Sequence, residues 1–269
     1  MTLKAITFDL WLTLIWDSKE LEDYRKLRRL VNFHRYANKI HNNSGIKEAP
    51  FKFQQVRLAM EALAEKAKER YREGKDIHPN ERGKMLFEML KINVEEQDRE
   101  EIYARAGTIL SNSGYMRKFP SLNPEARPTF KALKKEFPNL KIALVSNAAR
   151  STRTYVRTLK ALGVGHFFDH FVISCEVGYL KPRKEIFETA LKLLDVDPKE
   201  TIHVGDLFRA DVIGANEAGM NACLYSGLWH KYAQYMNPGE RIPSDYNTRN
   251  LVAEEIEHLQ DLIPIARTI

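Results

Sequence analysis

The sequence predicts an α/β protein with a parallel sheet, helices on both sheet faces, and an inserted all-helical domain. After residue 124, short β-rich runs alternate with helical patterns, as is typical of parallel sheets. Between residues 17 and 120, long charged helical patterns occur without a convincing strand. We therefore divide the chain into a core of residues 1–16 and 121–269 and a helical domain of residues 17–120.

Five short runs rich in apolar and β-branched residues are predicted to be strands. They cover residues 4–8, 141–146, 171–174, 201–205 and 221–225. The first run lies in an apolar stretch near the amino terminus that is interrupted by Lys4 and Asp9 and is too short to cross a bilayer. We therefore expect it to be a core strand rather than a signal or membrane segment.

Helical periodicity appears in both parts of the chain. In the inserted domain it covers roughly residues 19–40, 51–72, 80–90 and 94–112. In the core it covers residues 151–162, 184–194 and 212–218, with a last helix expected near residues 252–263. The long segment Ser226 to Ser244, rich in aromatic residues, has no predicted role.

The composition excludes several classes of protein. Of the 269 residues, 43% are hydrophobic and 29% charged, which is ordinary for globular proteins and unlike disordered, collagen-like or membrane-spanning chains. The two cysteines, Cys175 and Cys223, are too few for a disulfide framework and lack metal-ligand spacing. A reducing cytoplasm is therefore the expected location.

The net charge is +6, and the inserted domain carries most of it, with 22 basic and 17 acidic residues. This balance favours anionic metabolites as partners. Because basic residues alternate with acidic ones and no recognised nucleic-acid module appears, no specific nucleic-acid or membrane partner is expected. Either a monomer or a homodimer is compatible with the sequence.

Polar side chains stand at the carboxyl ends of four predicted strands, and such ends meet at one edge of a parallel sheet. They are Asp9, Ser146 with Asn147, Lys181, and Asp206 with Asp211. Two carboxylates, Asp9 and Asp206, suit a hard Mg²⁺ ion, and Lys181 and Ser146 suit phosphate oxygens. Carboxylates meeting at one site would repel each other, so either a cation or Lys181 must balance them. The set as a whole favours phosphoryl transfer with Mg²⁺ as the cofactor.

These residues resemble the four ordered motifs of the haloacid dehalogenase superfamily. The matching segments are Asp9 to Leu14, Ser146-Asn147, Lys181-Pro182 and Gly205 to Asp211. The long helical interval between the first two motifs is similar to that of members with a helical cap at this position. The resemblance covers essentially the whole chain, and it implies a Rossmann-like core whose strand ends are closed by the cap.

The resemblance also implies roles for the matched residues. In phosphatases of the family, the residue matching Asp9 attacks phosphorus and forms an aspartyl phosphate. Asp206 and the backbone carbonyl at Trp11 are expected to join Asp9 in binding Mg²⁺, with Asp211 orienting them or binding through water. The residues expected to contact phosphate are Ser146, Asn147 and Lys181. Because a cap excludes large molecules, the implied substrate is a small phosphorylated metabolite.

Position 11 departs from the phosphatase pattern. Family phosphatases usually carry there a second aspartate as general acid and base, whereas this chain has Trp11, whose indole cannot do this near neutral pH. The change spares the backbone carbonyl but removes proton transfer worth roughly 10²- to 10⁴-fold. The usual glycine at the next position is also absent and is replaced by Leu12.

Several residues of the cap and its hinge are candidates to replace the missing acid and base: Asp17, Asp23, His34 and His41. The histidines of the core are expected to be structural: His166, His170 and His203. Trp11 itself either packs in the core or lines the substrate pocket.

Two other functions compete with a phosphatase. A metal-independent 2-haloacid dehalogenase also carries an aromatic residue at the position of Trp11, and there the residue matching Asp9 attacks carbon. Asp206 and Asp211 argue against it, because without a metal they would oppose an anionic haloacid. The second alternative is a noncatalytic protein that binds Mg²⁺ and a phosphorylated ligand without turnover.

Overall fold

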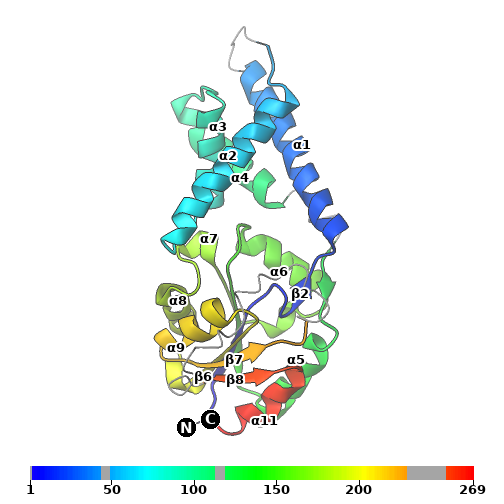
Figure 1. Cartoon of the computed structure of the whole chain (residues 1–269), viewed down its shortest axis with the longest axis vertical. Coiled ribbons are helices and arrows are strands. Elements are labelled where there is room, and N and C mark those ends of the chain that lie inside the picture. The colour runs from blue at the N-terminus through cyan, green and yellow to red at the C-terminus, as the bar shows by residue number, and fades with distance from the viewer. Residues whose placement is uncertain (1, 44–48, 113–118, 229–252) are drawn as a thin grey trace.

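The computed structural model describes residues 2–43, 49–112, 119–228 and 253–269. Figure 1 shows an elongated molecule with a helical part at one end and an α/β core at the other. The two chain termini lie together at the end of the core farthest from the helices (Figure 1). The predicted fold class is thereby confirmed.

The central sheet has six strands in the order β5-β4-β1-β6-β7-β8, and every neighbouring pair is parallel. The strands are β1 (Ala5–Phe8), β4 (Lys141–Ser146), β5 (His170–Ile173), β6 (Thr201–Gly205), β7 (Asn221–Tyr225) and β8 (Ala253–Ile256). Phe8 at the end of β1 is in register with Leu144 of β4 and Val204 of β6. The carboxyl ends of these three strands therefore meet around β1, where ligands bind in such sheets.

All five predicted strands are present within one residue of their expected limits. The expected last helix near residues 252–263 is wrong, because it begins with β8, and only Leu262–Ala266 forms an α-helix, α11. Glutamates make the sequence of β8 look helical, but pairing with β7 outweighs this weak local preference. Most of Ser226 to Ser244 lies outside the described residues.

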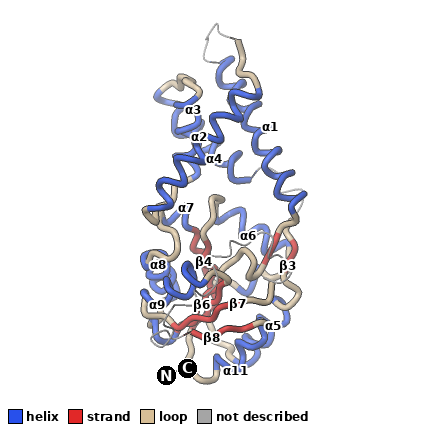
Figure 2. The backbone as a smooth tube through the Cα atoms, viewed as in Figure 1, coloured by secondary structure: helices blue, strands red, loops and turns tan. Residues whose placement is uncertain are grey.

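Two hydrophobic clusters cover the two faces of the sheet, as alternating side chains of β4 show. Ile142 and Leu144 pack in one cluster, with α5 (Ala126–Glu136), α6 (Thr152–Ala161) and α11. Val145 packs in the other, with α8 (Lys184–Leu194) and α9 (Gly214–Glu217). Figure 2 shows the strands enclosed between helices. This packing fixes the positions of the strand ends.

Short elements complete the core and the inserted part. They are β2 (Ile15–Trp16), β3 (Ser121–Leu122), α7 (Ser174–Val177), the 3₁₀ turns Glu96–Asp98, Gly165–Phe167, Pro198–Glu200 and Leu259–Asp261, and a π-helical turn at Phe208–Ile213. The predicted helix at residues 212–218 thus begins as a π turn, a feature often found at functional sites.

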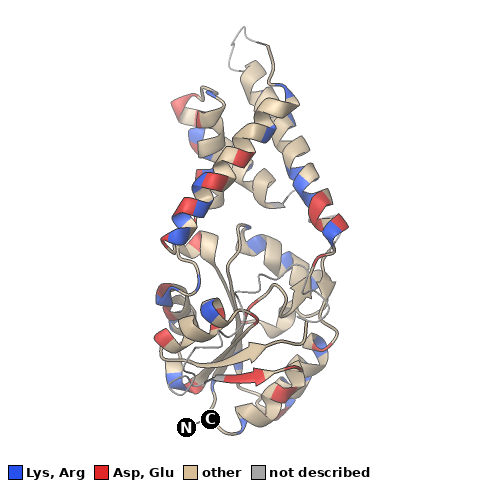
Figure 3. Cartoon of the chain, in the orientation of Figure 1, with Lys and Arg blue, Asp and Glu red and all other residues tan. Residues whose placement is uncertain are grey.

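The helical insert consists of α1 (Lys19–Asn43), α2 (Phe53–Arg72), α3 (Pro79–Met89) and α4 (Arg99–Asn112). It has its own hydrophobic cluster, which includes Phe33, Leu63 and Phe87. A Cβ atom at Gly107 of α4 would stand 2.6 Å from the carbonyl of Pro79, so glycine allows α3 and α4 to approach closely. Acidic and basic residues are interspersed along α2, whereas the acidic residues of α1 lie only in its first turns (Figure 3).

The insert joins the core at two places. Both connecting chains are paired, because β2 runs antiparallel to β3. The turn between α2 and α3 touches the loop after α7, where the Asp76 amide donates to the Gly178 carbonyl at 2.9 Å. No helix within the described residues is long and apolar enough to span a membrane.

Candidate active site

Three predicted site residues form a buried ionic cluster at the carboxyl ends of the strands. The Lys181 ammonium lies 2.6 Å from Asp9 Oδ1 and 2.5 Å from Asp211 Oδ1. Asp9 follows β1, where its backbone amide donates to the Val204 carbonyl of β6 at 2.8 Å. The side chains of Lys181, Asp9 and Asp211 are at most 9% exposed. The structure therefore brings together residues that are far apart in the sequence.

Asp211 is held from several sides. Its Oδ1 also lies 3.0 Å from His203 Nε2, and its Oδ2 accepts the Leu207 amide at 2.9 Å. A Cβ atom at Gly205 would stand 2.1 Å from the Asp211 carboxyl carbon, so only glycine at the end of β6 leaves room for it. With its carboxylate fully engaged, Asp211 is arranged to position Lys181 rather than to bind a ligand directly.

His203 is buried within the sheet and connects β1 to this cluster. Its Nε2 faces a carboxylate, so that nitrogen carries the hydrogen and donates, and Nδ1 accepts the Thr7 hydroxyl at 2.8 Å. Burial lowers the pKa of His203, although Asp211 opposes this effect. A neutral His203 therefore fixes the orientation of Asp211. By contrast, His166 is exposed and packs on Phe167, and His170 begins β5.

The cluster contains more negative than positive charge. Asp206 at the end of β6 is 3% exposed, and no basic side chain within the described residues forms an ion pair with it. Burial, together with the charges of Asp9 and Asp211, raises the pKa of Asp206 well above its usual range. Burial also raises the pKa of Asp9 to about 6, although Lys181 opposes the shift. The site thus has one ammonium for three carboxylates.

The oxygen donors fit the predicted Mg²⁺ ion. Asp9 and Asp206 are hard ligands at neighbouring strand ends, and their unbalanced charge is what a divalent cation neutralises. No group of three or more His, Cys, Asp or Glu in the described ranges is arranged to hold a metal, since Lys181 engages Asp9 and Asp211. The two carboxylates would therefore need further oxygens, such as the Trp11 carbonyl, water or substrate.

Ser146 and Asn147 have different surroundings at the end of β4. Ser146 Oγ is buried without a hydrogen-bond partner among the described residues, which is costly unless a ligand supplies one. The Asn147 side chain is instead engaged with the backbone of Lys181. It accepts the Lys181 amide at 2.7 Å and donates to its carbonyl at 3.0 Å. Asn147 therefore positions Lys181, and its contact with phosphate stays a prediction.

Trp11 lies two residues after Asp9, but its indole cannot act as the missing general acid and base. Its side chain is partly buried and packs against the main hydrophobic cluster of the core. Leu12 adopts φ +58°, a left-handed conformation that favours glycine. The usual glycine would fit this turn without strain, so the structure explains why the substitution at Leu12 is unusual.

The candidate replacements for the acid and base are occupied or distant. Asp17 is ion-paired with buried Arg25, and Asp23 lies on the surface with Lys19. His34 contacts the Phe51 carbonyl at 2.9 Å, about 22 Å along α1 from its start near the core. His41 lies farther along α1, where its ring packs on Phe51. None of the four contacts a residue of the ionic cluster.

Sequence reasoning missed three residues between the insert and the core. Asp76, from the turn before α3, accepts the Ser174 hydroxyl of the core at 2.5 Å. Arg29 of α1 and Arg150 of the loop after β4 line one cavity of about 270 Å³. No local pattern marks these residues, because each is one of many charged residues on an amphipathic or polar segment.

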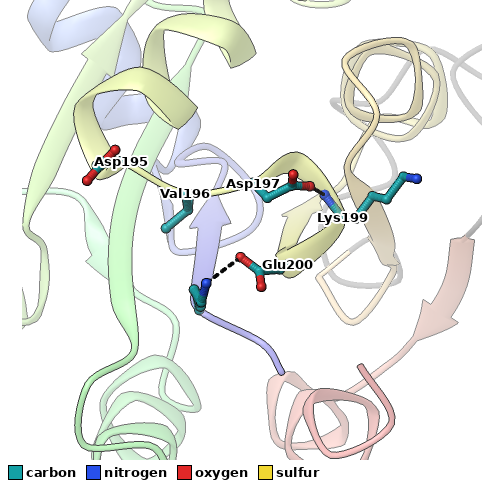
Figure 4. Close-up of a pocket in the computed structure, with 6 residues that line it drawn as sticks. Asp195, Val196, Asp197, Lys199 and Glu200 are labelled. Atoms are coloured by element: carbon teal, nitrogen blue, oxygen red, sulfur yellow. Dashed lines mark hydrogen bonds and ion pairs between the residues drawn. The ribbon is translucent and has the colours of Figure 1, made fainter. Parts of the chain in front are cut away.

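A second cavity, of about 500 Å³, lies at the opposite edge of the sheet (Figure 4). Two of its acidic side chains already have partners. Glu200 is 2.8 Å from Lys4, and Asp197 accepts the Lys199 amide at 2.8 Å. Because this hollow stands at the amino ends of β1 and β6, it is separate from the cluster around Lys181.

Comparisons with known proteins agree with this geometry. A family model described as haloacid dehalogenase-like hydrolase matches residues 3–219. A glyceraldehyde 3-phosphate phosphatase from Methanothermobacter thermautotrophicus is 36% identical over 107 residues, 40% of this chain and 46% of that protein. One of the same name from Methanopyrus kandleri is 28% identical over 222 residues, 81% of this chain and 82% of that protein. The chain thus spans about half the length of the first of these relatives.

A solved structure shows the same fold across the whole chain. The crystal structure of a 2-haloacid dehalogenase from Pseudomonas syringae pv. Tomato DC3000 superimposes with a TM-score of 0.63 and covers 100% of both chains. Its sequence identity is 20%, so the likeness concerns the fold alone. The two curated relatives are named as phosphatases, whereas this structure is named as a dehalogenase.

Proposed function

The chain belongs to the haloacid dehalogenase-like hydrolase family, and from that premise we propose that it is a Mg²⁺-dependent phosphatase of small phosphorylated metabolites. The observation that supports this most is the buried charge imbalance at the strand ends. Lys181 supplies one ammonium, which pairs with Asp9 and Asp211, while the buried Asp206 beside them has no ion-pair partner among the described residues. A divalent cation balances this excess, whereas an anionic haloacid without a metal would add to it.

In the proposed reaction, Asp9 is the nucleophile. A carboxylate oxygen of Asp9 attacks phosphorus, the bond from phosphorus to the ester oxygen breaks, and that oxygen keeps the electron pair and takes a proton from solvent to leave as the alcohol. Water then attacks phosphorus, the bond from phosphorus to the Asp9 oxygen breaks, and the proton lost by the water passes to solvent, so that phosphate is released and the Asp9 carboxylate is restored. We expect the buried hydroxyl of Ser146 and the ammonium of Lys181 to donate to phosphate oxygens.

The residues that would hold Mg²⁺ are Asp9, Asp206 and the Trp11 backbone carbonyl, with Asp211 orienting Lys181 beside them. When bound, the ion neutralises phosphate charge that would otherwise repel the attacking carboxylate. Lys181 serves the same purpose from the other side, and Asn147 and Asp211 fix its position. Residues of this chain are thus proposed for binding, attack, charge balance and positioning.

The leaving group must obtain its proton without an aspartate at position 11. Because Trp11 cannot donate one, an aryl phosphate, whose leaving group needs no protonation, is expected to react faster than an alkyl phosphate. Hydrolysis of the aspartyl phosphate then becomes the slower step, since no general base activates the water. A single-turnover rate that does not depend on the pKa of the leaving group would contradict this part of the proposal.

The experiment measures phosphate release from 4-nitrophenyl phosphate with and without Mg²⁺, using the parent and Asp9→Asn purified in parallel. Release that requires both Mg²⁺ and Asp9 supports the proposal and excludes a contaminating phosphatase. Halide release from a 2-haloacid without metal would instead favour the dehalogenase alternative. Mg²⁺-dependent ligand binding with neither product would favour a noncatalytic protein.

A further inference from the structure

We propose that Arg29 and Arg150 form a second anion-binding site between the helical insert and the core. On this view, the substrate carries a carboxylate or a second phosphate in addition to the phosphate that reacts. The inference rests on the proposed phosphatase function and specifies its substrate class.

The cavity of about 270 Å³ has basic and apolar walls. Three arginines line it, Arg29 of α1, Arg82 of α3 and Arg150 of the core, and no Asp or Glu among the described residues does. Met60, Leu63 and Leu110 provide apolar surface from the insert. An apolar wall reduces the screening of charges by water, so an anion entering this cavity would interact strongly with an arginine.

The arginines of this region differ in their partners. Arg82 is 2.8 Å from Asp76 and also donates to the Tyr71 hydroxyl, and Arg25 is paired with Asp17. Arg29, by contrast, forms no hydrogen bond or ion pair within the described part of the chain. Glu22, which acts on Arg29 only from a distance, is ion-paired with Lys19 and Lys26.

The electrostatic surroundings of Arg29 are consistent with a missing anion. Burial, together with the positive charges of Arg150 and Arg25, lowers the pKa of Arg29 to about 10. A carboxylate or phosphate bound at this point would remove the repulsion. The planar guanidinium group matches both anions through paired hydrogen bonds.

The second site is close enough to the first for one small molecule to reach both. Arg150 follows Ser146 by four residues, so their Cα atoms are at most about 14 Å apart. The intervening loop is held in place, since the Ala148 amide donates to Ser174 Oγ at 2.9 Å, and Asn147 binds the Lys181 backbone. Arg29 then approaches from the insert, on the other side of the cavity.

A series of three-carbon phosphates with one type of leaving group tests the proposal. The compounds are propyl phosphate, 3-(phosphonooxy)propanoate and 1,3-propanediol bisphosphate, which end in a methyl group, a carboxylate and a phosphate. We expect kcat/KM for at least one doubly anionic compound to exceed that for propyl phosphate by about 10- to 100-fold in the parent. The compound with the larger ratio identifies which anion the site prefers.

Arg29→Met and Arg150→Met are expected to reduce the ratio of kcat/KM for the doubly anionic compound to kcat/KM for propyl phosphate toward one. The change should come mainly from a higher KM for the doubly anionic compound. The matched control is Arg57→Met, because Arg57 is an exposed arginine of α2 paired with Glu61, and there the ratio should persist. A ratio near one in a parent that still hydrolyses propyl phosphate with Mg²⁺ overturns the second site and leaves the proposed function intact.

Binding to the Asp9→Asn protein separates the two proposals. We expect this variant to bind a doubly anionic compound at least 10-fold more tightly than propyl phosphate, and the added Arg29→Met change to abolish the difference. Equal affinities overturn the second site. Tight binding of the doubly anionic compound, with no phosphate released by the parent, would contradict only the proposed function.

Discussion

Two charged regions of the molecule are unbalanced in opposite directions. At the strand ends, Lys181 pairs with Asp9 and Asp211, and the buried carboxyl group of Asp206 has no ion-pair partner among the described residues. Between the insert and the core, Arg29 faces the same cavity as Arg150 without an anionic partner of its own. Buried charges are normally paired, because an unpaired one is costly. Binding a cation would therefore balance the charge of the first region, and binding an anion would balance that of the second.

The two regions also differ in how firmly their charged side chains are held. Asp211 is held by hydrogen bonds to His203, Leu207 and Lys181, and Asp9 is held by the same Lys181. Arg29 has no such hydrogen bonds among the described residues and lies on α1 of the insert. We infer that the first region is preorganised for chemistry and the second for recognition of the substrate.

The largest effect is expected from breaking the balance at Lys181. Lys181→Met leaves Asp9 and Asp211 without their shared cation, so we expect kcat/KM for 4-nitrophenyl phosphate to fall at least about 10³-fold. The free energy of unfolding should fall by about 3–5 kcal/mol, because the buried carboxylates lose their partner. Lys184→Met, at an exposed lysine paired with Glu188, serves as the control and should change both quantities little.

Trp11→Asp sharpens the first region by supplying the acid and base that it lacks. We expect the single-turnover rate of leaving-group release to rise by about 10²-fold or more for alkyl phosphates. For aryl phosphates this rate should rise less, because only alkyl leaving groups need the proton. Trp11→Phe keeps an aromatic side chain and should not produce the gain. Equal acceleration of both substrate types in single-turnover assays would contradict the assigned role.

The effect of pH on stability tests the excess of negative charge. The pKa of Asp9 is raised to about 6, so the folded protein binds more protons than the unfolded chain between about pH 4 and 6. The free energy of unfolding contributed by Asp9 therefore falls as the pH rises through this window. In EDTA at pH 7.5, Asp9→Asn should be more stable than the parent by up to about 3 kcal/mol.

Thermal unfolding in EDTA across this pH range provides the measurement. The difference in free energy of unfolding between Asp9→Asn and the parent should close near pH 4, where the side chain at position 9 is neutral in both folded proteins. Comparing the two proteins cancels the titration of His203, which they share. Mg²⁺ at pH 7.5 should stabilise the parent more than the variant, and a gap independent of pH would show that Asp9 is not the source.

The smallest effect on stability is expected from a substitution at Arg29, in the cavity between the insert and the core. Arg29→Met removes a positive charge that is repelled by Arg150 and Arg25, so the unliganded protein should become slightly more stable, by less than about 1 kcal/mol. Arg57→Met, which breaks an exposed pair with Glu61, should not stabilise it. Thermal unfolding at low salt distinguishes them, and a loss of stability in Arg29→Met would show that Arg29 is structurally paired.

The sequence by itself determined the strands of the core, the inserted helices and the order of the residues at the strand ends. Buried parallel strands are continuous apolar runs, and a polar residue where such a run stops is a local pattern. Asp9, Lys181 and Asp211 were predictable as one site for this reason, since parallel strands bring their carboxyl ends to one edge.

The tertiary structure alone decided which partners these residues have. Asn147 and His203 position Lys181 and Asp211, β8 replaces a predicted helix by pairing with β7, and Arg29 and Arg150 line one cavity. Each result depends on which face of an element meets another element far away in the chain. Local sequence carries no record of that contact, because the free energy that selects it comes from packing and charge pairing between distant segments.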